Sequence, residues 1–309
     1  MDINITEAEN GATVLEILRK KMKISARSLN RLKYTEGGIT VNGEHVTVRR
    51  VLTTGDVLSL DVGDRPRADG TEGGGVIPRR LPLDIIYEDG EIIVANKAAG
   101  MPTHPTHGHL DDTLANALAF RAETRGMPFV FRPANRLDRN TSGIVLAACD
   151  QITSCRLFDQ MRTGQIKKTY IAVTRGVPAE PCGVIDAPIA RADVGTLMRV
   201  VDETGELGGQ EAQTEYRTVK VSPDGKYALV VLNPRTGRTH QIRVHMAYIG
   251  CPLVGDFLYG EESDLISRHA LHAVRLEFSH PADNRKMIMA APLPEDMARL
   301  CSALFKDQV

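Results

Sequence analysis

The sequence predicts an α+β protein in two parts, a small α/β domain at residues 11–62 and a larger domain at residues 83–305. The larger domain should contain a mixed, largely antiparallel sheet flanked by helices. Its predicted strands come in hairpins and meanders and not in regular βαβ units. Residues 63–82 between the two parts are rich in Gly and Pro, so we expect a flexible linker there.

The elements of the small domain follow from apolar spacing and turn residues. Apolar side chains at helical spacing indicate a first helix, and Ser25 is typical of the N-cap of a second one. The pair Asn42-Gly43 between two apolar runs favours a β-hairpin. The expected elements are helices over 14–22 and 26–33, a hairpin that begins at 39–41 and returns through Val46 and Val48, and a strand over 57–62.

The elements of the larger domain follow from the same signals. Asp89-Gly90 is typical of a hairpin turn, and Asp112-Thr113 and Asp150 of helix starts. The expected strands are a hairpin over 85–94, a buried strand over 144–148, and strands over 170–173, 227–232 and 271–278. A helix is expected from 113 to about 126, and another after Asp150 that buries Ile152, Cys155, Phe158 and Met161. A short helix, capped by Thr239, should bury Ile242, Met246 and Ile249 and end at Gly250.

The charge of the chain is spread unevenly. The net charge of −1 argues against a nucleic-acid partner, yet residues 11–50 contain nine Lys and Arg against three Glu. A phosphate backbone contacts one face of a protein and does not respond to the summed charge alone. This segment therefore predicts nucleic-acid contact, with Arg27, Arg31 and Lys33 on the second helix.

Several other classes of protein are disfavoured. The five cysteines form no C-x-x-C pair, which argues against a disulfide framework and a zinc site and favours a reducing cytoplasm. No apolar run approaches the roughly 20 residues of a membrane span. His104, His107 and His109 lie in a loop with no Cys nearby, so we expect no metal there. The run Gly73-Gly74-Gly75 lacks the Lys-Ser or Lys-Thr of a phosphate loop.

The most unusual stretch is the loop from Asn135 to Gly143, which leads into the buried strand. Asp138 lies between Arg136 and Arg139, and two nearby cations favour an ionised carboxylate that can act as a nucleophile, a base or an ion-pair partner. The alternative is an ordinary turn, in which these polar side chains satisfy local backbone groups.

Two further stretches carry candidate binding residues. Residues 233–245 place basic side chains near a helix N-terminus, an arrangement that suits phosphate, although a solvated basic face is the alternative. In the second stretch, Lys168 could contact phosphate and Tyr170 could present its ring to a base, although packing in a strand is the alternative. The basic residues of the first stretch are Arg235, Arg238, His240, Arg243 and His245.

Together these stretches resemble the RluA-type pseudouridine synthase family. Its HRLD-x-x-T-S-G signature is similar to Asn135–Gly143, with Asn135 in place of the usual His and Asn140 where Asp is frequent. Its K-x-Y element matches Lys168 and Tyr170, and its K-P-x-G motif resembles Lys97–Gly100, with Ala98 in place of Pro. Its later motifs match Gly237, Arg238, His240, Gln241, Ile242, Arg243, His245, Gly250, Pro252, Leu253, Gly255, Asp256, Tyr259 and Gly260.

The resemblance implies an enzyme that isomerises uridine in RNA to pseudouridine without a metal or a redox cofactor. It makes Asp138 the essential carboxylate, as a nucleophile on the anomeric carbon or as a base at the neighbouring ribose carbon. Arg243 would pair with Asp138, Tyr170 would stack on the flipped uracil, and Arg136 would fill the vacated space. Arg139, Lys168, Arg238 and His240 are the further RNA-contacting residues expected in this domain. Residues 11–62 resemble the alpha-L RNA-binding domain, first named from a small-subunit ribosomal protein.

The resemblance leaves the target uridine open. Large-subunit ribosomal RNA is the expected substrate and tRNA the alternative, and we expect a cytoplasmic monomer that does not contact membranes. Two other classes remain as alternatives. One is a non-catalytic RNA-binding protein, against which the intact Asp138, Tyr170 and Arg243 speak. The other is a hydrolase, which would need a second carboxylate near Asp138.

Overall fold

The structure is a computed structural model of the chain. It describes residues 2–22, 24, 26–35, 37–61, 76–193 and 195–305, without the side chains of residues 26–28 and 31. The predicted cap Ser25, the end of the predicted strand at Val62 and the greater part of the predicted linker lie outside the described residues.

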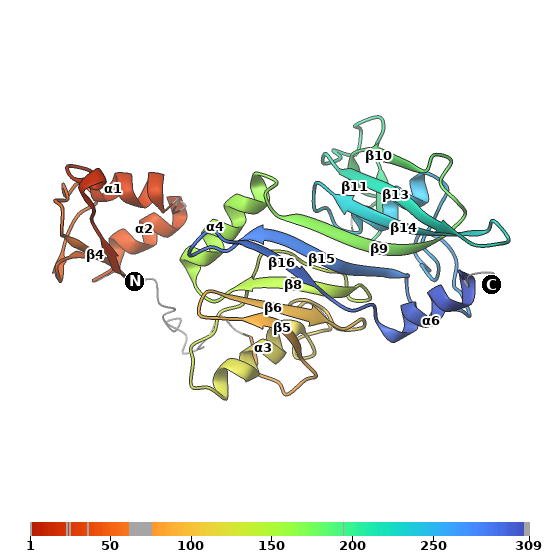
Figure 1. Cartoon of the computed structure of the whole chain (residues 1–309), viewed down its shortest axis with the longest axis horizontal. Helices are drawn as coiled ribbons and strands as arrows, with labels where there is room; N and C mark the ends of the chain where they lie inside the picture. The colour runs from red at the N-terminus through yellow and green to blue at the C-terminus, as the bar shows by residue number, and fades with distance from the viewer. Residues whose placement is uncertain are drawn as a thin grey trace.

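The N-terminal domain packs two helical segments on a four-stranded sheet in the order β1-β4-β2-β3 (Figure 1). The strand β1, which was not predicted from the sequence, pairs with β4. Buried apolar side chains from both helical segments and from the sheet form one core. The elements are β1 (Asp2–Asn4), a 3-10 turn (Glu7–Glu9), α1 (Val14–Glu16) continued by a π-helical turn (Ile17–Lys21), α2 (Ala26–Tyr34), β2 (Ile39–Val41), β3 (Glu44–His45) and β4 (Val57–Leu60).

The predicted hairpin of this domain is present, but its return strand is shorter than expected. Asn42 and Gly43 adopt positive φ angles of 53° and 86°, as a tight hairpin turn requires. The strand β3 ends at His45, and Val48 leaves the ladder because its carbonyl accepts a hydrogen bond from the Leu15 N–H (2.9 Å). The chain thus turns towards α1 before it reaches β4.

The larger domain is built on a ten-stranded mixed sheet in the order β10-β13-β14-β9-β15-β8-β6-β5, with β16 paired to β15 and β7 to β8 (Figure 1). Among its described strand pairs, only β8 and β15 are parallel, which confirms the predicted sheet type. A separate ribbon of β11 and β12 lies beside it. The strands are β5 (Asp84–Glu88), β6 (Ile92–Lys97), β7 (Arg132–Pro133), β8 (Ser142–Ala148), β9 (Lys167–Arg175), β10 (Cys182–Asp186), β11 (Ile189–Arg191), β12 (Arg199–Val201), β13 (Gln213–Val221), β14 (Tyr227–Pro234), β15 (Leu271–Ser279) and β16 (Lys286–Ala290).

The helices of this domain begin at capping residues. Thr113 caps α3 (Leu114–Glu123) and Asp150 caps α4 (Gln151–Arg162), as predicted. The cap of α5 (Gln241–Tyr248) is not Thr239 but His240, whose φ angle is 58°. The last described helix is α6 (Glu295–Leu304). No helix in the described part of the chain is long and apolar enough to cross a membrane.

The predicted buried face of α4 is wrong at Phe158. The buried residues are Ile152, Thr153, Leu157 and Gln160, whereas Phe158 is 69% exposed. Gln160 fixes the rotation of the helix because its side-chain amide donates to the Ser279 carbonyl (2.8 Å) and accepts from the Ser279 N–H (2.9 Å). The opposite side of the helix end, with Phe158, therefore faces away from the sheet.

The end of the predicted linker is attached to the larger domain. The Arg79 N–H donates to the Asn116 carbonyl (3.1 Å), and the Asn116 side-chain amide donates to the Ile77 carbonyl (2.7 Å). Residues 76–80 therefore run against α3.

Strand β8 runs so close to its parallel neighbour β15 that its second residue must be glycine. All seven residues of β8 are buried. Gly143 has a φ angle of +116°, and a Cβ atom there would lie 2.3 Å from the Ala273 carbonyl oxygen. The glycine of the signature is therefore a requirement of the sheet beneath the loop and not of the loop's chemistry.

We expect Gly143→Ala to lower the free energy of unfolding by about 3 kcal/mol, because it adds backbone strain and an overlap with a neighbouring strand. Gly225→Ala is the matched control, since Gly225 also has a positive φ angle (70°) but has open space around its Cα. Denaturant unfolding followed by circular dichroism measures both. Equal losses of unfolding free energy for the two variants would contradict the close approach of β8 and β15 at Gly143.

Candidate active site

The loop with Asp138 is anchored to β8 by its first residue. The Asn135 side-chain amide donates to the Ile144 carbonyl (2.9 Å) and accepts from the Leu146 N–H (2.9 Å). At its other end, the Thr141 hydroxyl contacts His269 Nε2 (2.8 Å). Asn135, which replaces the His of the family signature, thus has a structural role that suits an amide side chain.

Two buried basic side chains, Lys97 and Arg268, contact the backbone of this loop. The Lys97 ammonium donates to the carbonyls of Ala98, Met101 and Arg139 at 2.9, 2.6 and 3.1 Å. Burial lowers the pKa of Lys97 to about 7. The guanidinium of Arg268 donates to the Asn140 carbonyl (3.1 Å) and is paired through two nitrogens with Asp296. These contacts hold the two loop carbonyls that directly follow Asp138.

Asp138 itself is partly open to solvent, with 27% of its side chain exposed. Its Oδ2 lies 3.4 Å from Nη1 of Arg243, which is only 5% exposed. The other nitrogens of Arg243, Nε and Nη2, donate to the two carboxylate oxygens of Asp256 at 2.7 Å each. A buried two-pronged pair therefore fixes the guanidinium in the plane that points its third nitrogen at Asp138.

A second contact to Asp138 comes from the start of α5. His240 Nε2 lies 3.9 Å from Asp138 Oδ2, and His240 Nδ1 is hydrogen-bonded to the Tyr259 hydroxyl (2.8 Å). The Tyr259 hydroxyl also accepts from the Arg199 N–H (2.9 Å), and its ring lies 5.0 Å from the Arg243 guanidinium carbon. Burial lowers the pKa of His240. Tyr259 thus contacts both of the side chains that face Asp138.

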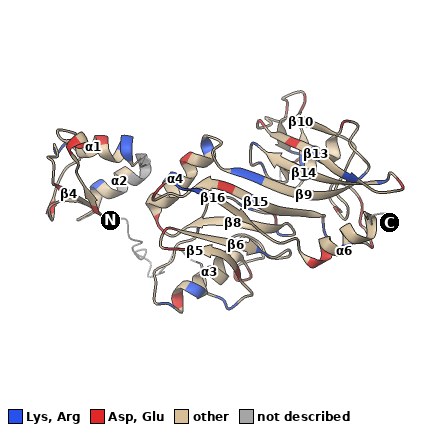
Figure 2. Cartoon of the chain, in the orientation of Figure 1, with Lys and Arg blue, Asp and Glu red and all other residues tan. Residues whose placement is uncertain are grey.

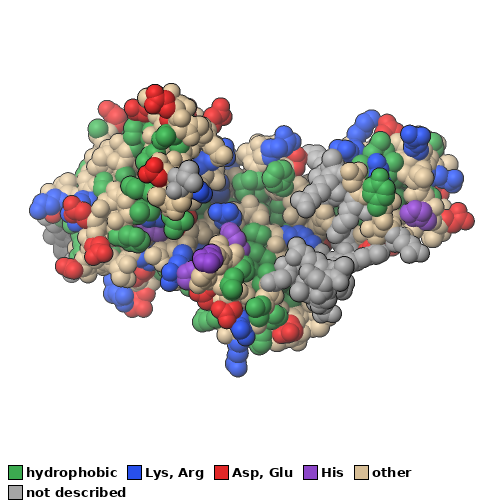
Figure 3. Space-filling view, turned by 180° about the vertical axis from the view of Figure 1, so that it is seen from behind, with side chains coloured by type: hydrophobic (Ala, Val, Ile, Leu, Met, Phe, Trp, Pro, Cys, Tyr) green, Lys and Arg blue, Asp and Glu red, His purple; other side chains and the backbone are tan. Residues whose placement is uncertain are grey.

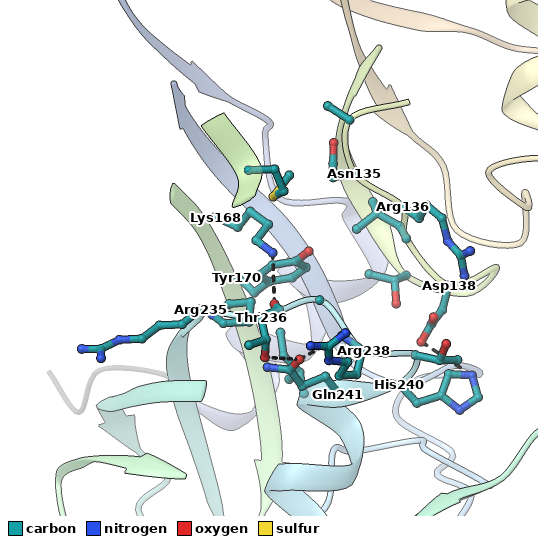
Figure 4. A pocket seen from close by; sticks show the side chains of 18 of the residues that line it. Asn135, Arg136, Asp138, Lys168, Tyr170, Arg235, Thr236, Arg238, His240 and Gln241 are labelled. Carbon is teal, nitrogen blue, oxygen red and sulfur yellow. Dashed lines mark hydrogen bonds and ion pairs between the residues drawn. The ribbon is translucent and has the colours of Figure 1, made fainter. Parts of the chain in front are cut away.

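The opposite wall comes from β9. Tyr170 is 8% exposed, and burial, with Asp138 nearby, raises the pKa of its phenol well above the usual value, so the ring is neutral at physiological pH. The Lys168 ammonium donates to the Thr236 carbonyl (3.1 Å), and burial lowers its pKa to about 8. Figure 4 shows Lys168 and Tyr170 across the cavity from Arg136 and Asp138.

These walls enclose a cavity of about 620 Å³. On the face shown in Figure 3, Lys, Arg and His side chains gather over the middle of the larger domain. Its lining comes from five places in the chain: the loop before β8, the end of α4, the start of β9, the β14–α5 connection with the start of α5, and Leu271 at the start of β15. Its lining side chains include Arg136, Asp138, Phe158, Met161, Arg162, Lys168, Tyr170, Arg238, His240 and Arg243.

Seven of the predicted site residues line this one cavity, namely Arg136, Asp138, Lys168, Tyr170, Arg238, His240 and Arg243. Arg139 does not: its guanidinium donates to the Gly100 carbonyl (3.1 Å) and contacts His109 Nε2 (3.2 Å). Lys33 is exposed in the other domain, and the side chains of Arg27 and Arg31 lie outside the described residues. Arg235 points away from the cavity centre (Figure 4), paired with Glu215.

Three contributors to the site were not predicted from the sequence. Asp256 and Tyr259 belong to matched motifs but received no role, and Phe158 was expected in the core. The motif match was the available signal for Asp256, whose pairing with Arg243 depends on the tertiary structure.

Comparison with known proteins agrees with this arrangement. The sequence model of the family described as RNA pseudouridylate synthase matches residues 91–248, which contain Asp138, Tyr170 and Arg243. This chain belongs to that family. The family and the reaction class that the sequence predicted, those of an RNA pseudouridine synthase, are thereby confirmed. Residues 1–58 match the model described as the N-terminal domain of RluD ribosomal pseudouridine synthase.

Other pseudouridine synthases are similar over most of their length. An uncharacterised RNA pseudouridine synthase of Bacillus subtilis, YjbO, is 37% identical over 280 residues, which are 91% of this chain and 95% of the relative. Ribosomal large subunit pseudouridine synthase D of Pseudomonas aeruginosa is 35% identical over 88% of this chain and 86% of its own. The solved structure of human RNA pseudouridylate synthase domain containing 1 superposes with a TM-score of 0.56, at 27% identity, over 72% of this chain and 86% of its own.

Proposed function

We propose that this protein isomerises defined uridines of large-subunit ribosomal RNA to pseudouridine, with Asp138 as the essential carboxylate. The observation that carries the proposal is the single cavity in which Asp138, the Arg243 fork and the Tyr170 ring face one another. The relatives named as ribosomal large subunit pseudouridine synthases support the choice of RNA.

The reaction breaks the bond from ribose C1′ to uracil N1, turns the base and joins C1′ to C5. The proton on C5 leaves, N1 gains a proton, and no electrons are exchanged overall. Asp138 can serve either as a nucleophile on C1′ or as a base at C2′, and both routes need its ionised form. Arg243, held by Asp256, keeps a positive charge beside that carboxylate and limits its rotation.

The uridine must first leave its stack, which costs a few kcal/mol and least in a loop or distorted helix. The neutral Tyr170 ring offers a flat surface to the flipped uracil, and the exposed Arg136 is in reach of the space that the base leaves. Among the described residues that line the cavity, Asp138 is the only carboxylate. A glycoside hydrolase that uses a carboxylate pair would need a second one there.

We also propose that the protein acts as a monomer in the cytoplasm, and that its N-terminal domain holds the RNA. The core of that domain consists of its own apolar side chains together with Ile152 of α4, and its basic run at residues 19–21 follows α1 (Figure 2). Light scattering of the purified chain tests the monomer, since a mass of twice 33.8 kDa would contradict it.

Mapping of pseudouridine in cells with and without this gene tests the function. Carbodiimide adducts on pseudouridine stop reverse transcriptase, so each modified position gives one stop. We expect the loss of one or a few stops in large-subunit ribosomal RNA. Loss of stops only in tRNA would move the substrate to tRNA, and no lost stop in any RNA would contradict the proposed reaction.

We expect deletion of residues 1–62 to weaken RNA binding and to flatten its salt dependence, while some activity remains. Each lost phosphate contact should reduce the slope of log affinity against log salt by about 0.9 on duplex or about 0.7 on single strands. Filter binding over a salt series measures the slope, with circular dichroism as the folding control. An unchanged slope would place the phosphate contacts in the larger domain.

A further inference from the structure

The cavity contains a second aromatic side chain that the reaction above does not use. Phe158, near the end of α4, is 69% exposed and lines the same cavity as Asp138 and Tyr170. Single exposed apolar residues are common on protein surfaces, so the exposure of Phe158 alone indicates nothing. Its position at the opening of a cavity lined by cationic side chains is what distinguishes it.

The last turn of α4 presents a mixed apolar and cationic surface next to this ring. Met161 and Arg162 follow Phe158 by three and four residues, so the three side chains share one face of the helix, and all three line the cavity. Arg162 is 65% exposed, and its Nη2 donates to Asp159 Oδ1 (2.7 Å), which orients the guanidinium. A flat ring with a guanidinium one helical turn away is suited to a base with its phosphate.

The cavity also has more room than the target base requires. Its volume of about 620 Å³ is in the range that holds a whole drug-sized ligand, whereas uracil is a single six-membered ring. Tyr170 comes from β9 and Phe158 from α4, so the two rings belong to different parts of the wall. One flipped base against Tyr170 therefore leaves the α4 side of the cavity open.

We propose that Phe158 is a stacking platform for a nucleotide next to the target uridine, with Arg162 near its phosphate. When the uridine leaves the stack, a neighbouring base loses a stacking partner, and an exposed aromatic ring can replace it. Such stacking tolerates any base, because every base has a π-face, so Phe158 contributes affinity and register more than sequence choice. This inference rests on the proposed function, since it needs a flipped uridine in the same cavity.

The probe is the RNA stem-loop that contains the mapped uridine. We expect Phe158→Ala to raise the Kd and the KM for this RNA about tenfold, within the range measured for base–aromatic stacking, with a smaller change in kcat. Phe158→Tyr keeps a flat ring and should bind within about twofold of wild type. Ile288→Ala is the matched control, because Ile288 is a half-exposed apolar side chain on β16 outside the cavity.

Abasic analogues in the same stem-loop separate stacking from other losses. Removing the base of one nucleotide beside the target should weaken wild type about tenfold and should weaken Phe158→Ala no further. The stacking platform is wrong if Phe158→Ala binds the RNA as tightly as wild type does. It is also wrong if every abasic position weakens the binding of Phe158→Ala by the same factor as it weakens the binding of wild type. If wild type isomerises no uridine of the RNA, the proposed function fails, whatever Phe158 contributes to binding.

Discussion

Replacing Asp138 with asparagine should abolish pseudouridine formation and leave RNA affinity nearly unchanged. Asparagine has the same shape, but it carries no charge, so it can act neither as a nucleophile nor as a base. We expect a loss on the order of 10⁴-fold in the rate of the chemical step, typical of removing an essential catalytic group. Asp138 is partly exposed and its nearest ion-pair partner lies at 3.4 Å, so the fold should not depend on its charge.

Single-turnover rates at saturating enzyme measure this step apart from binding. Filter binding gives the Kd, and we expect it to stay within a fewfold of wild type. The reason is that an anionic carboxylate makes no favourable contact with the anionic phosphates of RNA. A rate of even a tenth of wild type would show that Asp138 is not the catalytic group.

The second large effect is expected for Arg243→Lys. The three guanidinium nitrogens of Arg243 contact two carboxylates. Nε and Nη2 donate to Asp256, and Nη1 donates to Asp138. Lysine keeps one positive charge but has a single ammonium group, which cannot hold Asp256 in a fork and also reach Asp138. We expect a loss of about 100-fold in the single-turnover rate, because small displacements of a catalytic group cost that much, with little change in Kd.

Asp256→Asn is the companion variant for this test. It removes the buried partner of Arg243 without altering either group that faces Asp138, so a positioning role predicts a rate loss in the same direction. Because breaking a buried pair also destabilises a fold, thermal unfolding of both variants must show that they are folded at the assay temperature. A wild-type single-turnover rate for Arg243→Lys would make Arg243 a phosphate contact and not an orienting residue.

The sequence predicted the sheet well where local signals agree with the tertiary structure. The apolar run of β8 and the cap Asp150 both lie where expected. The rotation of α4 was not predictable, because Leu157 and Phe158 are adjacent apolar residues and either could face the sheet. The amide of Gln160, which contacts the backbone of β15 at Ser279, decides between them, and a helical pattern carries no information about that contact.

The site was predictable in its composition but not in its pairing. The sequence places Arg136 and Arg139 on either side of Asp138, yet only Arg136 lines the cavity, because the Arg139 guanidinium contacts the Gly100 carbonyl. The partner of Arg243 is likewise decided by tertiary structure. Asp256 follows it by 13 residues, on the loop between α5 and β15. Motif spacing alone could identify Asp256 as a member of the site but not as the residue that holds the guanidinium.

Nucleoside analysis after reaction is the most direct measurement of whether this cavity isomerises uridine through Asp138. Purified wild type and Asp138→Asn are each incubated with transcribed large-subunit ribosomal RNA, and the digested nucleosides and free bases are quantified by chromatography and mass spectrometry. We predict that wild type forms pseudouridine in amounts equal to the uridine lost, without free uracil, and that the variant forms none. Free uracil without pseudouridine, or equal pseudouridine from both proteins, would contradict the assignment.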